Sequence, residues 1–207
     1  MRKRQLAMLL SRLEGFKEPK AELEQYRTPG NVAAELLWLA ASHGDIGGKL
    51  VADLGAGTGV LGIGAAVLGA RKVYAVEKDR EALRRAEENA ERAGVRERME
   101  FFEGDVSEFG LRVDTVVMNP PFGSQRPHAD RPFLMKAFEI ADVVYSIHLA
   151  KEGVREFVEK FAAESGFRVT HRVELPFEIP AQFPFHRKRI ERVRVDVYRF
   201  QRERFGG

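Results

Sequence analysis

The feature that most constrains this chain is a regular alternation of short apolar segments with helical ones. The expected strands are Lys49–Leu54, Lys72–Val76, Met99–Phe102, Val113–Met118 and Val143–Ile147. The expected helices between and after them are Val60–Leu68, Asp79–Ala93, Pro132–Ala141 and Val154–Ala163. This alternation predicts an α/β fold, a parallel sheet with helices on both faces. Arg168–Leu175 and Glu191–Phe200 have no helix between them, which predicts an antiparallel hairpin at one end of the sheet.

Length and composition bound the possibilities further. The 207 residues suit one domain, 1–207, in which two helices, Arg4–Leu13 and the segment from Asn31 to Ser42, form an N-terminal extension over residues 1–43. The absence of cysteine excludes disulfides, thiolate nucleophiles and cysteine-based metal sites, and the five histidines lack zinc-ligand spacing, so we expect no metal. No segment is long and apolar enough to span a bilayer, and no signal peptide is expected, which indicates a soluble, cytoplasmic protein.

The loop between the first strand and its helix is rich in glycine. Gly55, Gly57 and Gly59 let the backbone turn sharply and approach a ligand at the helix N-terminus. Gly57–Gly62 also fits the dinucleotide pattern G-x-G-x-x-G, with Glu77 about 20 residues downstream, as that motif requires. In a second interpretation, Asp53–Gly59 resembles the first motif of class I S-adenosylmethionine-dependent methyltransferases.

Two acids follow the next two strands, at the same edge of the predicted sheet. In the methyltransferase interpretation Glu77 accepts hydrogen bonds from both ribose hydroxyls. Asp105 accepts one from the adenine amino group of the cofactor, and the backbone N–H of Val106 serves a ring nitrogen. A dehydrogenase has no need of the second acid, and the structural alternative for Asp105 is a turn residue.

Asn119-Pro120-Pro121-Phe122 follows the fourth strand directly, and it is the most informative stretch of the chain. The exocyclic nitrogen of adenine is a poor nucleophile because its lone pair is delocalised into the ring. The Asn119 side-chain oxygen and the Pro120 carbonyl can accept its two hydrogens, free the lone pair and stabilise the charge that develops on nitrogen. Phe122 offers a flat face to a base taken out of its stack. The tetrapeptide resembles the signature of methyltransferases that act on adenine N6, cytosine N4 or protein glutamine.

The chain as a whole resembles the methyltransferase-like protein 5 family, the small-subunit ribosomal RNA adenine-N6 methyltransferases. The segments that carry the resemblance are Leu-Glu-Gln-Tyr (23–26), Gly-Asp-Ile (44–46), Val-Ala-Asp-Leu-Gly (51–55), Asn-Pro-Pro-Phe-Gly (119–123), Val-Tyr-Ser-Ile-His (144–148) and Phe-His-Arg-Lys (185–188). The resemblance implies a Rossmann-like fold with a seven-stranded, mostly parallel sheet whose last strand is antiparallel, and a catalytic core over residues 44–207.

The resemblance also implies the site residues. Cofactor contacts are expected at Gln25, Thr28, Gly55, Gly57, Thr58, Val60, Glu77, Asp105 and Val106, and catalysis at Asn119, Pro120, Pro121 and Phe122. Thr58 stands where the family often has a small or sulfur-bearing residue and Glu77 where Asp is usual, and both substitutions keep the hydrogen-bonding capacity. Tyr145 and His148 could line the substrate pocket or form a buried pair.

The resemblance implies partners as well. The basic and aromatic residues of 183–189, together with eight basic and three acidic residues between Arg187 and Gly207, suit ribosomal RNA, although a connector between strands explains them equally well. In the family a small zinc-ribbon activator covers the edge strand that corresponds to Met99–Phe102, since an open edge is a template for pairing. Two alternative functions remain: a protein glutamine methyltransferase and a non-catalytic RNA-binding or ribosome assembly factor.

Overall fold

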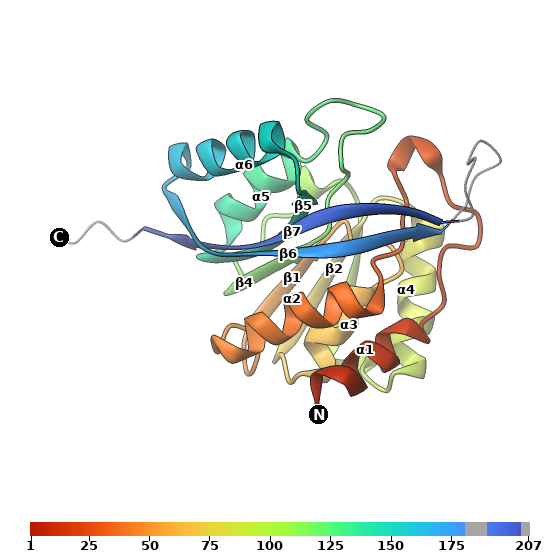
Figure 1. Cartoon of the computed structure of the whole chain (residues 1–207). Helices are drawn as coiled ribbons and strands as arrows, with labels where there is room; N and C mark the ends of the chain where they lie inside the picture. Colours follow the sequence, from red (N-terminus) through yellow and green to blue (C-terminus); the bar gives the residue numbers. More distant parts are fainter. Residues whose placement is uncertain (181–189, 204–207) are drawn as a thin grey trace.

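The computed structural model describes residues 1–180 and 190–203, and its centre is one sheet of seven strands in the order β3-β2-β1-β4-β5-β7-β6 (Figure 1). The strands are β1 (Leu50–Leu54), β2 (Lys72–Glu77), β3 (Met99–Glu103), β4 (Thr115–Met118), β5 (Val143–Leu149), β6 (Phe167–Pro180) and β7 (Ile190–Arg202). Six strands run parallel, and β7 is antiparallel to both of its neighbours. The predicted sheet and its closing hairpin are therefore confirmed.

Helices cover both faces of this sheet (Figure 1). They are α1 (Lys3–Ser11), α2 (Gly30–Ser42), α3 (Val60–Val67), α4 (Arg80–Arg92), α5 (Arg131–Ile140) and α6 (Glu152–Glu164). One apolar core joins α1, α2, α3 and α4 to one face, and a second core joins α5 and α6 to the other. The central strands β1 and β4 between the two cores are buried almost throughout, as is typical of strands that are covered on both sides.

The β6–β7 hairpin is longer than the sequence pattern predicts. Pairing continues from Phe167 opposite Arg202 to Pro180 opposite Ile190, well beyond the end of β5. Because Phe177 is fully buried against the first core, the hairpin packs back onto the molecule instead of projecting into solvent. Phe177 also meets the ring of Phe122, so this part of the hairpin adjoins the turn that follows β4.

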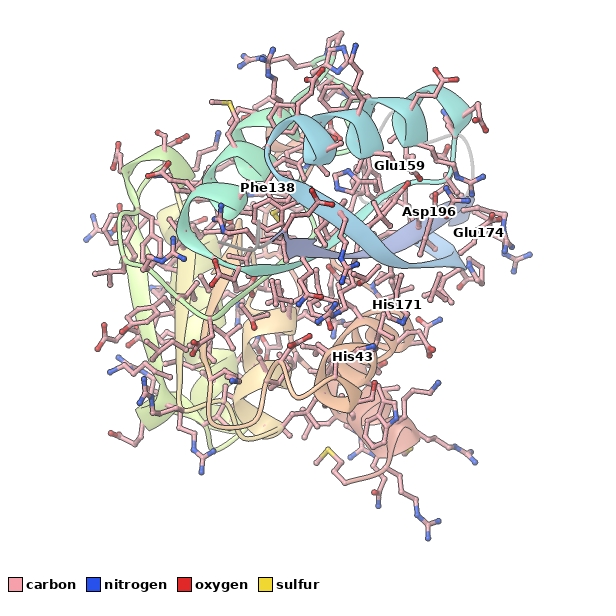
Figure 2. The ribbon with its side chains drawn as sticks, turned by 90° about the vertical axis from the view of Figure 1, so that its left-hand side faces the viewer. His43, Phe138, Glu159, His171, Glu174 and Asp196 are labelled. Carbon is pink, nitrogen blue, oxygen red and sulfur yellow. The ribbon has the colours of Figure 1, made fainter. Side chains whose placement is uncertain are left out.

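Ion pairs fix α6 to this hairpin. Arg155 on α6 donates to Asp196 on β7 through Nε, at 2.7 Å, and to Glu174 on β6 through Nη2, at 2.8 Å. Figure 2 shows Glu174 and Asp196 close together below α6, on which Glu159 also lies. The Asp196 carboxylate is fully buried, so its charge-assisted bond to Arg155 offsets the cost of desolvation.

The two edge strands of the sheet differ. β3 lies at one edge, as expected; its Phe102 is exposed, and Glu100 on the same strand pairs with Lys72. The other edge, β6, carries Pro176, a register irregularity between Val169 and His171, and exposed charged side chains, all of which discourage pairing. No helix in residues 1–180 and 190–203 has both the length and the apolar character that a membrane crossing requires.

Three short 3₁₀ turns were not predicted: η1 (Ala21–Leu23), η2 (Arg96–Arg98) and η3 (Val106–Glu108). The first belongs to the segment Lys20–Thr28, which we name the strap. The strap leads into α2, and Glu24 within it has a positive φ of 49°, an uncommon conformation for a residue with a side chain. The conformation of the strap places several polar side chains at the carboxyl ends of the parallel strands.

Candidate active site

The glycine loop between β1 and α3 is held in a tight, defined shape. The amides of Gly55 and Ala56 both donate to the Val76 carbonyl, at 2.9 Å each. Gly55 and Gly57 have φ values of 68° and 55°, which side chains disfavour. A Cβ at Gly55 would lie 2.7 Å from the Phe133 ring, and one at Gly57 would lie 2.9 Å from the Phe16 ring. Both positions therefore require glycine for two independent reasons.

Glu77 connects the end of β2 to this loop. Its Oε2 accepts a hydrogen bond from the Gly57 amide at 2.9 Å, and its Oε1 accepts one from the Asp79 amide at 2.9 Å. Burial raises the pKa of Glu77. Each carboxylate oxygen has two acceptor positions, so Glu77 can still accept the two ribose hydroxyls that the sequence assigns to it.

Gln25 of the strap is buried beside Glu77 and is bound at both ends of its side chain. Its Oε1 accepts from the Lys20 amide at 2.8 Å, and its Nε2 donates to Asp79 Oδ2 at 2.6 Å. Although burial alone would raise the pKa of Asp79, hydrogen bonds from Gln25 and Lys20 lower it. Gln25 therefore fixes the strap to the end of β2 in addition to facing the cavity.

Two more acids lie at this edge of the sheet. Asp53 is 1% exposed and accepts from the Gly62 amide at 2.7 Å; burial raises its pKa to about 7. Asp105 accepts from the amide and hydroxyl of Ser107, at 3.0 and 2.7 Å, and these bonds lower the pKa of Asp105. The edge therefore presents several carboxylates to one ligand position, which suits a ligand of positive charge.

Asn119 lies at the same edge of the sheet, directly after β4. Its Nδ2 donates to Thr28 Oγ1 of the strap at 2.9 Å, and this bond fixes the orientation of the amide. Asn119 Oδ1 is buried and has no hydrogen-bond partner among the described residues. Arg27 Nε and Tyr198 Oη are the other buried side-chain atoms without a partner among the described residues, and Asn119 is the residue of the predicted tetrapeptide that has one.

The rest of the tetrapeptide forms a rigid turn. Pro120 is buried and Pro121 faces the cavity, and neither residue has a backbone N–H. The Phe122 ring is partly exposed and meets Phe177 of β6 edge to face, with 5.5 Å between the ring centres. The Phe122 amide donates to Glu24 Oε2 at 2.8 Å.

A cavity of about 410 Å³ joins these groups, within the range of roughly 300–1,000 Å³ that small-molecule sites occupy. The predicted residues that line it are Gln25, Thr28, Gly55, Gly57, Thr58, Val60, Glu77, Asp105, Val106, Asn119 and Pro121. Pro120 and Phe122 are the two predicted site residues that do not line it. The structure thus gathers segments that are distant in sequence around one space.

Tyr145 and His148 do not line this cavity, so the interpretation of these residues as pocket residues is wrong. Tyr145 is fully buried and donates to Asp45 Oδ2 at 2.6 Å. His148 is also buried; its Nε2 lies 2.7 Å from Ser146 Oγ and its Nδ1 lies 3.1 Å from Asp130 Oδ2. Both side chains satisfy their polar atoms within the core, and His148 ties the start of α5 to β5.

Sequence reasoning missed several residues of the site. Phe16 and Phe133 close over the glycine loop, and Asp53 and Glu24 are buried acids whose contacts no motif reveals. Glu24 and Asp53 stand inside segments that the resemblance quotes, but without an assigned role. The segment 183–189, which the sequence assigns to RNA, lies outside the described residues. Within the described ranges, no group of three His, Asp or Glu side chains is placed to hold a metal ion.

Comparison with known proteins decides which ligand this geometry serves. The family profile of the methyltransferase small domain matches residues 33–154. The rRNA N6-adenosine methyltransferases of Danio rerio and Drosophila melanogaster are 37% and 36% identical to the chain, over 97% and 96% of its length and 99% and 95% of theirs. The chain belongs to this methyltransferase-like protein 5 family. It is an RNA adenine-N6 methyltransferase that depends on S-adenosylmethionine, so the dinucleotide interpretation of the glycine loop is set aside.

One solved structure is similar to the chain at a higher sequence identity than these relatives. A candidate RNA methyltransferase of Pyrococcus horikoshii is 64% identical, with 98% of each chain covered and a TM-score of 0.93. The fold and the arrangement of the family's segments therefore extend over nearly the whole chain.

The residues around the cavity fit the family's cofactor. The glycine loop offers a backbone surface that a Cβ would obstruct, and the carboxylates of Glu77, Asp105 and Asp53 suit hydroxyl, amino and cationic groups. Glu77 and Asp105 would hold the nucleoside end, and Gln25 and Thr28 the methionine end. Asn119 Oδ1 has a free acceptor position beside these groups, and an adenine amine is one kind of donor that would fit it.

Proposed function

We propose that this chain methylates the N6 amine of an adenosine in small-subunit ribosomal RNA. The observation that carries the proposal is the buried, unpartnered Asn119 Oδ1 at the cavity that also holds the glycine loop. The rRNA N6-adenosine methyltransferases among its relatives support the substrate class. The choice of the small subunit rests on the sequence resemblance.

The chemistry follows from the chain's own groups. S-adenosylmethionine supplies an electrophilic methyl group on a sulfonium centre. Asn119 Oδ1 and the Pro120 carbonyl accept the two N–H groups of the adenine amine and draw its lone pair out of the ring. The same two oxygens stabilise the positive charge that grows on nitrogen as the N–C bond forms and the S–C bond breaks, so no strong general base is needed before the step. The sulfur leaves as the neutral thioether of S-adenosylhomocysteine, and the methylated nitrogen then loses one proton to water. Thr28 keeps the Asn119 oxygen aimed at the amine.

The RNA reaches the cavity from the side of the β6–β7 hairpin. Phe177 of β6 packs on Phe122, so the hairpin adjoins the turn that binds the amine. β6 and β7 lead to residues 181–189, whose basic and aromatic side chains suit phosphate pairing and base stacking. Phe122 does not line the cavity itself, but its ring is partly exposed beside it, and we assign it the role of a supporting face for an adenine that enters from this side.

The activator belongs to this proposal. We propose that a small zinc-ribbon subunit pairs with β3, because that edge is open and carries the exposed Phe102, whereas β6 is protected. Co-expression should raise solubility and activity, and Phe102→Glu should abolish the gain. Met135→Glu, which also changes an exposed apolar side chain but on α5, should keep it. Equal solubility and activity with and without the activator would refute this part.

We further propose that residues 1–207 act as one domain in the cytoplasm, in which the extension 1–43 completes the cavity through the strap. Removing residues 1–28 should abolish binding of S-adenosylhomocysteine, because Gln25 and Thr28 are lost. Retained binding would show that residues 29–207 form the cofactor site without the strap.

The function is tested by methyl transfer from labelled S-adenosylmethionine to purified small and large ribosomal subunits from cells that lack the gene. Label in small-subunit RNA, recovered as N6-methyladenosine after digestion, is the expected result. Label in large-subunit RNA would correct the subunit. Label in a protein glutamine would favour the alternative methyltransferase, and binding of RNA without transfer would favour an assembly factor.

A further inference from the structure

Glu24 of the strap holds the turn that carries the tetrapeptide. Its Oε2 accepts from the Phe122 amide at 2.8 Å, and its Oε1 accepts from the Gln125 amide at 3.0 Å. Only 8% of Glu24 is exposed, and its backbone adopts the left-handed region with φ of 49°. A buried carboxylate in a disfavoured backbone conformation persists only where its surroundings compensate the cost, and strain of this kind gathers at functional sites.

The two prolines of the tetrapeptide explain why Glu24 binds the amide of Phe122. Pro120 and Pro121 have no N–H, so the Phe122 amide is the first backbone donor after Asn119. Glu24 takes that donor, and Thr28 of the same strap accepts from the Asn119 side chain. The Asn119–Phe122 turn is therefore held by the strap at both ends.

The neighbouring residue faces the other half of the site. Gln25 donates to Asp79 Oδ2 at 2.6 Å, and the Asp79 amide donates in turn to Glu77, the carboxylate assigned to the ribose. Glu24 and Gln25 are consecutive residues, and each has its own anchor, so one short segment is bonded to both halves of the site.

We propose that Glu24 is a positioning residue for methyl transfer, which keeps Asn119 Oδ1 and the Pro120 carbonyl in register with the methyl donor. This inference rests on the proposed function for the identity of the acceptor amine, but the hold of Glu24 on the turn does not depend on it. Misplacement of a reacting group by about 1 Å can lower a rate on the order of 100-fold, so the loss of this hold affects turnover more than binding.

The test compares Glu24→Ala and Glu24→Gln with Glu18→Ala, which removes an exposed acid from the segment before the strap. Hydrogen exchange of the full chain, without RNA, should speed up about 10-fold or more at the Phe122 and Gln125 amides in Glu24→Ala. The Gly57 amide, which Glu77 holds, should keep its exchange rate. Glu24→Gln retains one acceptor oxygen, so it should show an intermediate effect.

Kinetics then separate positioning from folding. In Glu24→Ala the kcat for RNA methylation should fall about 10- to 100-fold, while the Kd for S-adenosylhomocysteine and the KM for RNA stay within about 3-fold; Glu24→Gln should recover part of kcat. Unchanged exchange at Phe122 and Gln125 would overturn the hold itself, and this result is obtained even if RNA is not the substrate. Faster exchange with unchanged kcat, or equal losses of kcat and cofactor binding, would overturn the positioning role.

Discussion

The cavity has two halves: the donor half, which we assign to the methyl donor, and the acceptor half, which we assign to the adenine that accepts the methyl group. They differ in how many of their polar side-chain atoms already have hydrogen-bond partners within the protein. On the donor half the carboxylates of Asp53, Glu77 and Asp105 each accept at least one backbone amide, so the protein fixes them before any ligand arrives. On the acceptor half Asn119 Oδ1 is buried without a partner. The carboxylates of the donor half are thus preorganised by backbone amides, whereas the Asn119 amide of the acceptor half is preorganised by Thr28 and keeps one acceptor position free.

This difference has an energetic meaning. Leaving a buried acceptor unpaired costs about 1–3 kcal/mol, so a substrate amine that donates to Asn119 Oδ1 would gain from this bond. In the structure the Asn119 amide is oriented by its Nδ2, which donates to Thr28 Oγ1 at 2.9 Å. The substrate amine regains this energy where charge develops, and the same energy does not assist binding of the methyl donor.

The largest effect should follow from removal of the unpaired acceptor. Asn119→Ala should lower kcat for RNA methylation by about 100- to 1,000-fold, as loss of a preorganised charge-stabilising group does elsewhere. Isothermal titration should show the Kd for S-adenosylhomocysteine changed by less than about 3-fold, because Asn119 serves the other half.

Asn119→Asp is the matched variant for this test. It keeps the Oδ1 acceptor and should retain more activity than Asn119→Ala. A loss of cofactor affinity equal to the loss of kcat would place Asn119 in the donor half and erase the distinction between the two halves.

The next largest effect concerns the donor half. Glu77→Ala removes an acceptor from both the Gly57 and Asp79 amides as well as from the cofactor. Affinity for S-adenosylhomocysteine should fall about 10- to 100-fold, and the Tm should fall with it, since each unpaired buried amide costs about 1–3 kcal/mol. Glu77→Gln, which keeps one acceptor oxygen, should lose less of both. An unchanged Kd in Glu77→Ala would remove Glu77 from the cofactor site.

The smallest effect is a dependence on pH. Burial raises the pKa of Asp53 to about 7, so this carboxyl is neutral near pH 5.5 and gains charge toward pH 7. Binding of the cationic methyl donor favours the charged form of Asp53, so binding releases a proton and the affinity for S-adenosylmethionine should rise about 3- to 5-fold between pH 5.5 and 7.0.

The stability of the protein should change in the opposite direction. The pKa of Asp53 is higher in the folded than in the unfolded protein, so this group lowers the free energy of unfolding as the pH rises from about 4 to 7.

Two controls isolate this effect. Asp53→Asn should flatten most of the pH profile, and the remaining slope belongs to Glu77, whose pKa burial also raises. 5′-Methylthioadenosine, which carries no sulfonium and no amino acid, should bind with little dependence on pH in the native protein. An affinity for S-adenosylmethionine that falls with pH over this range would show that Asp53 does not sense the donor's charge.

Much of the fold, and the position of the donor-half acids at the edge of the sheet, could be predicted because both depend on residues that are close together in the sequence. Strand and helix periodicity fixes the α/β alternation, and the acids Glu77 and Asp105 follow their strands directly. The length of β6 and β7 could not be predicted, since it depends on pairing between the two strands and on burial of Phe177. The alternating charged residues of β6 and β7 indicate an exposed hairpin, so the sequence pattern does not predict that Phe177 is buried.

The hydrogen bonds from Glu24 to the acceptor half could not be predicted for another reason. Glu24 binds amides 98 and 101 residues away, and its left-handed backbone follows from those contacts. Motif reading placed Asn119 correctly at the edge of the sheet but did not reveal that Thr28, assigned to the cofactor, orients its amide. Tyr145 and His148 stand in a quoted segment, yet their polar atoms are satisfied inside the core.

The most direct measurement is a crystal structure of the chain with S-adenosylhomocysteine and an adenosine-containing RNA fragment. The adenine N6 should lie about 2.7–3.2 Å from Asn119 Oδ1 and within hydrogen-bond distance of the Pro120 carbonyl, with the cofactor ribose on Glu77. A base bound elsewhere, with Asn119 Oδ1 still unpaired or turned to the cofactor, would contradict the assignment of the two halves.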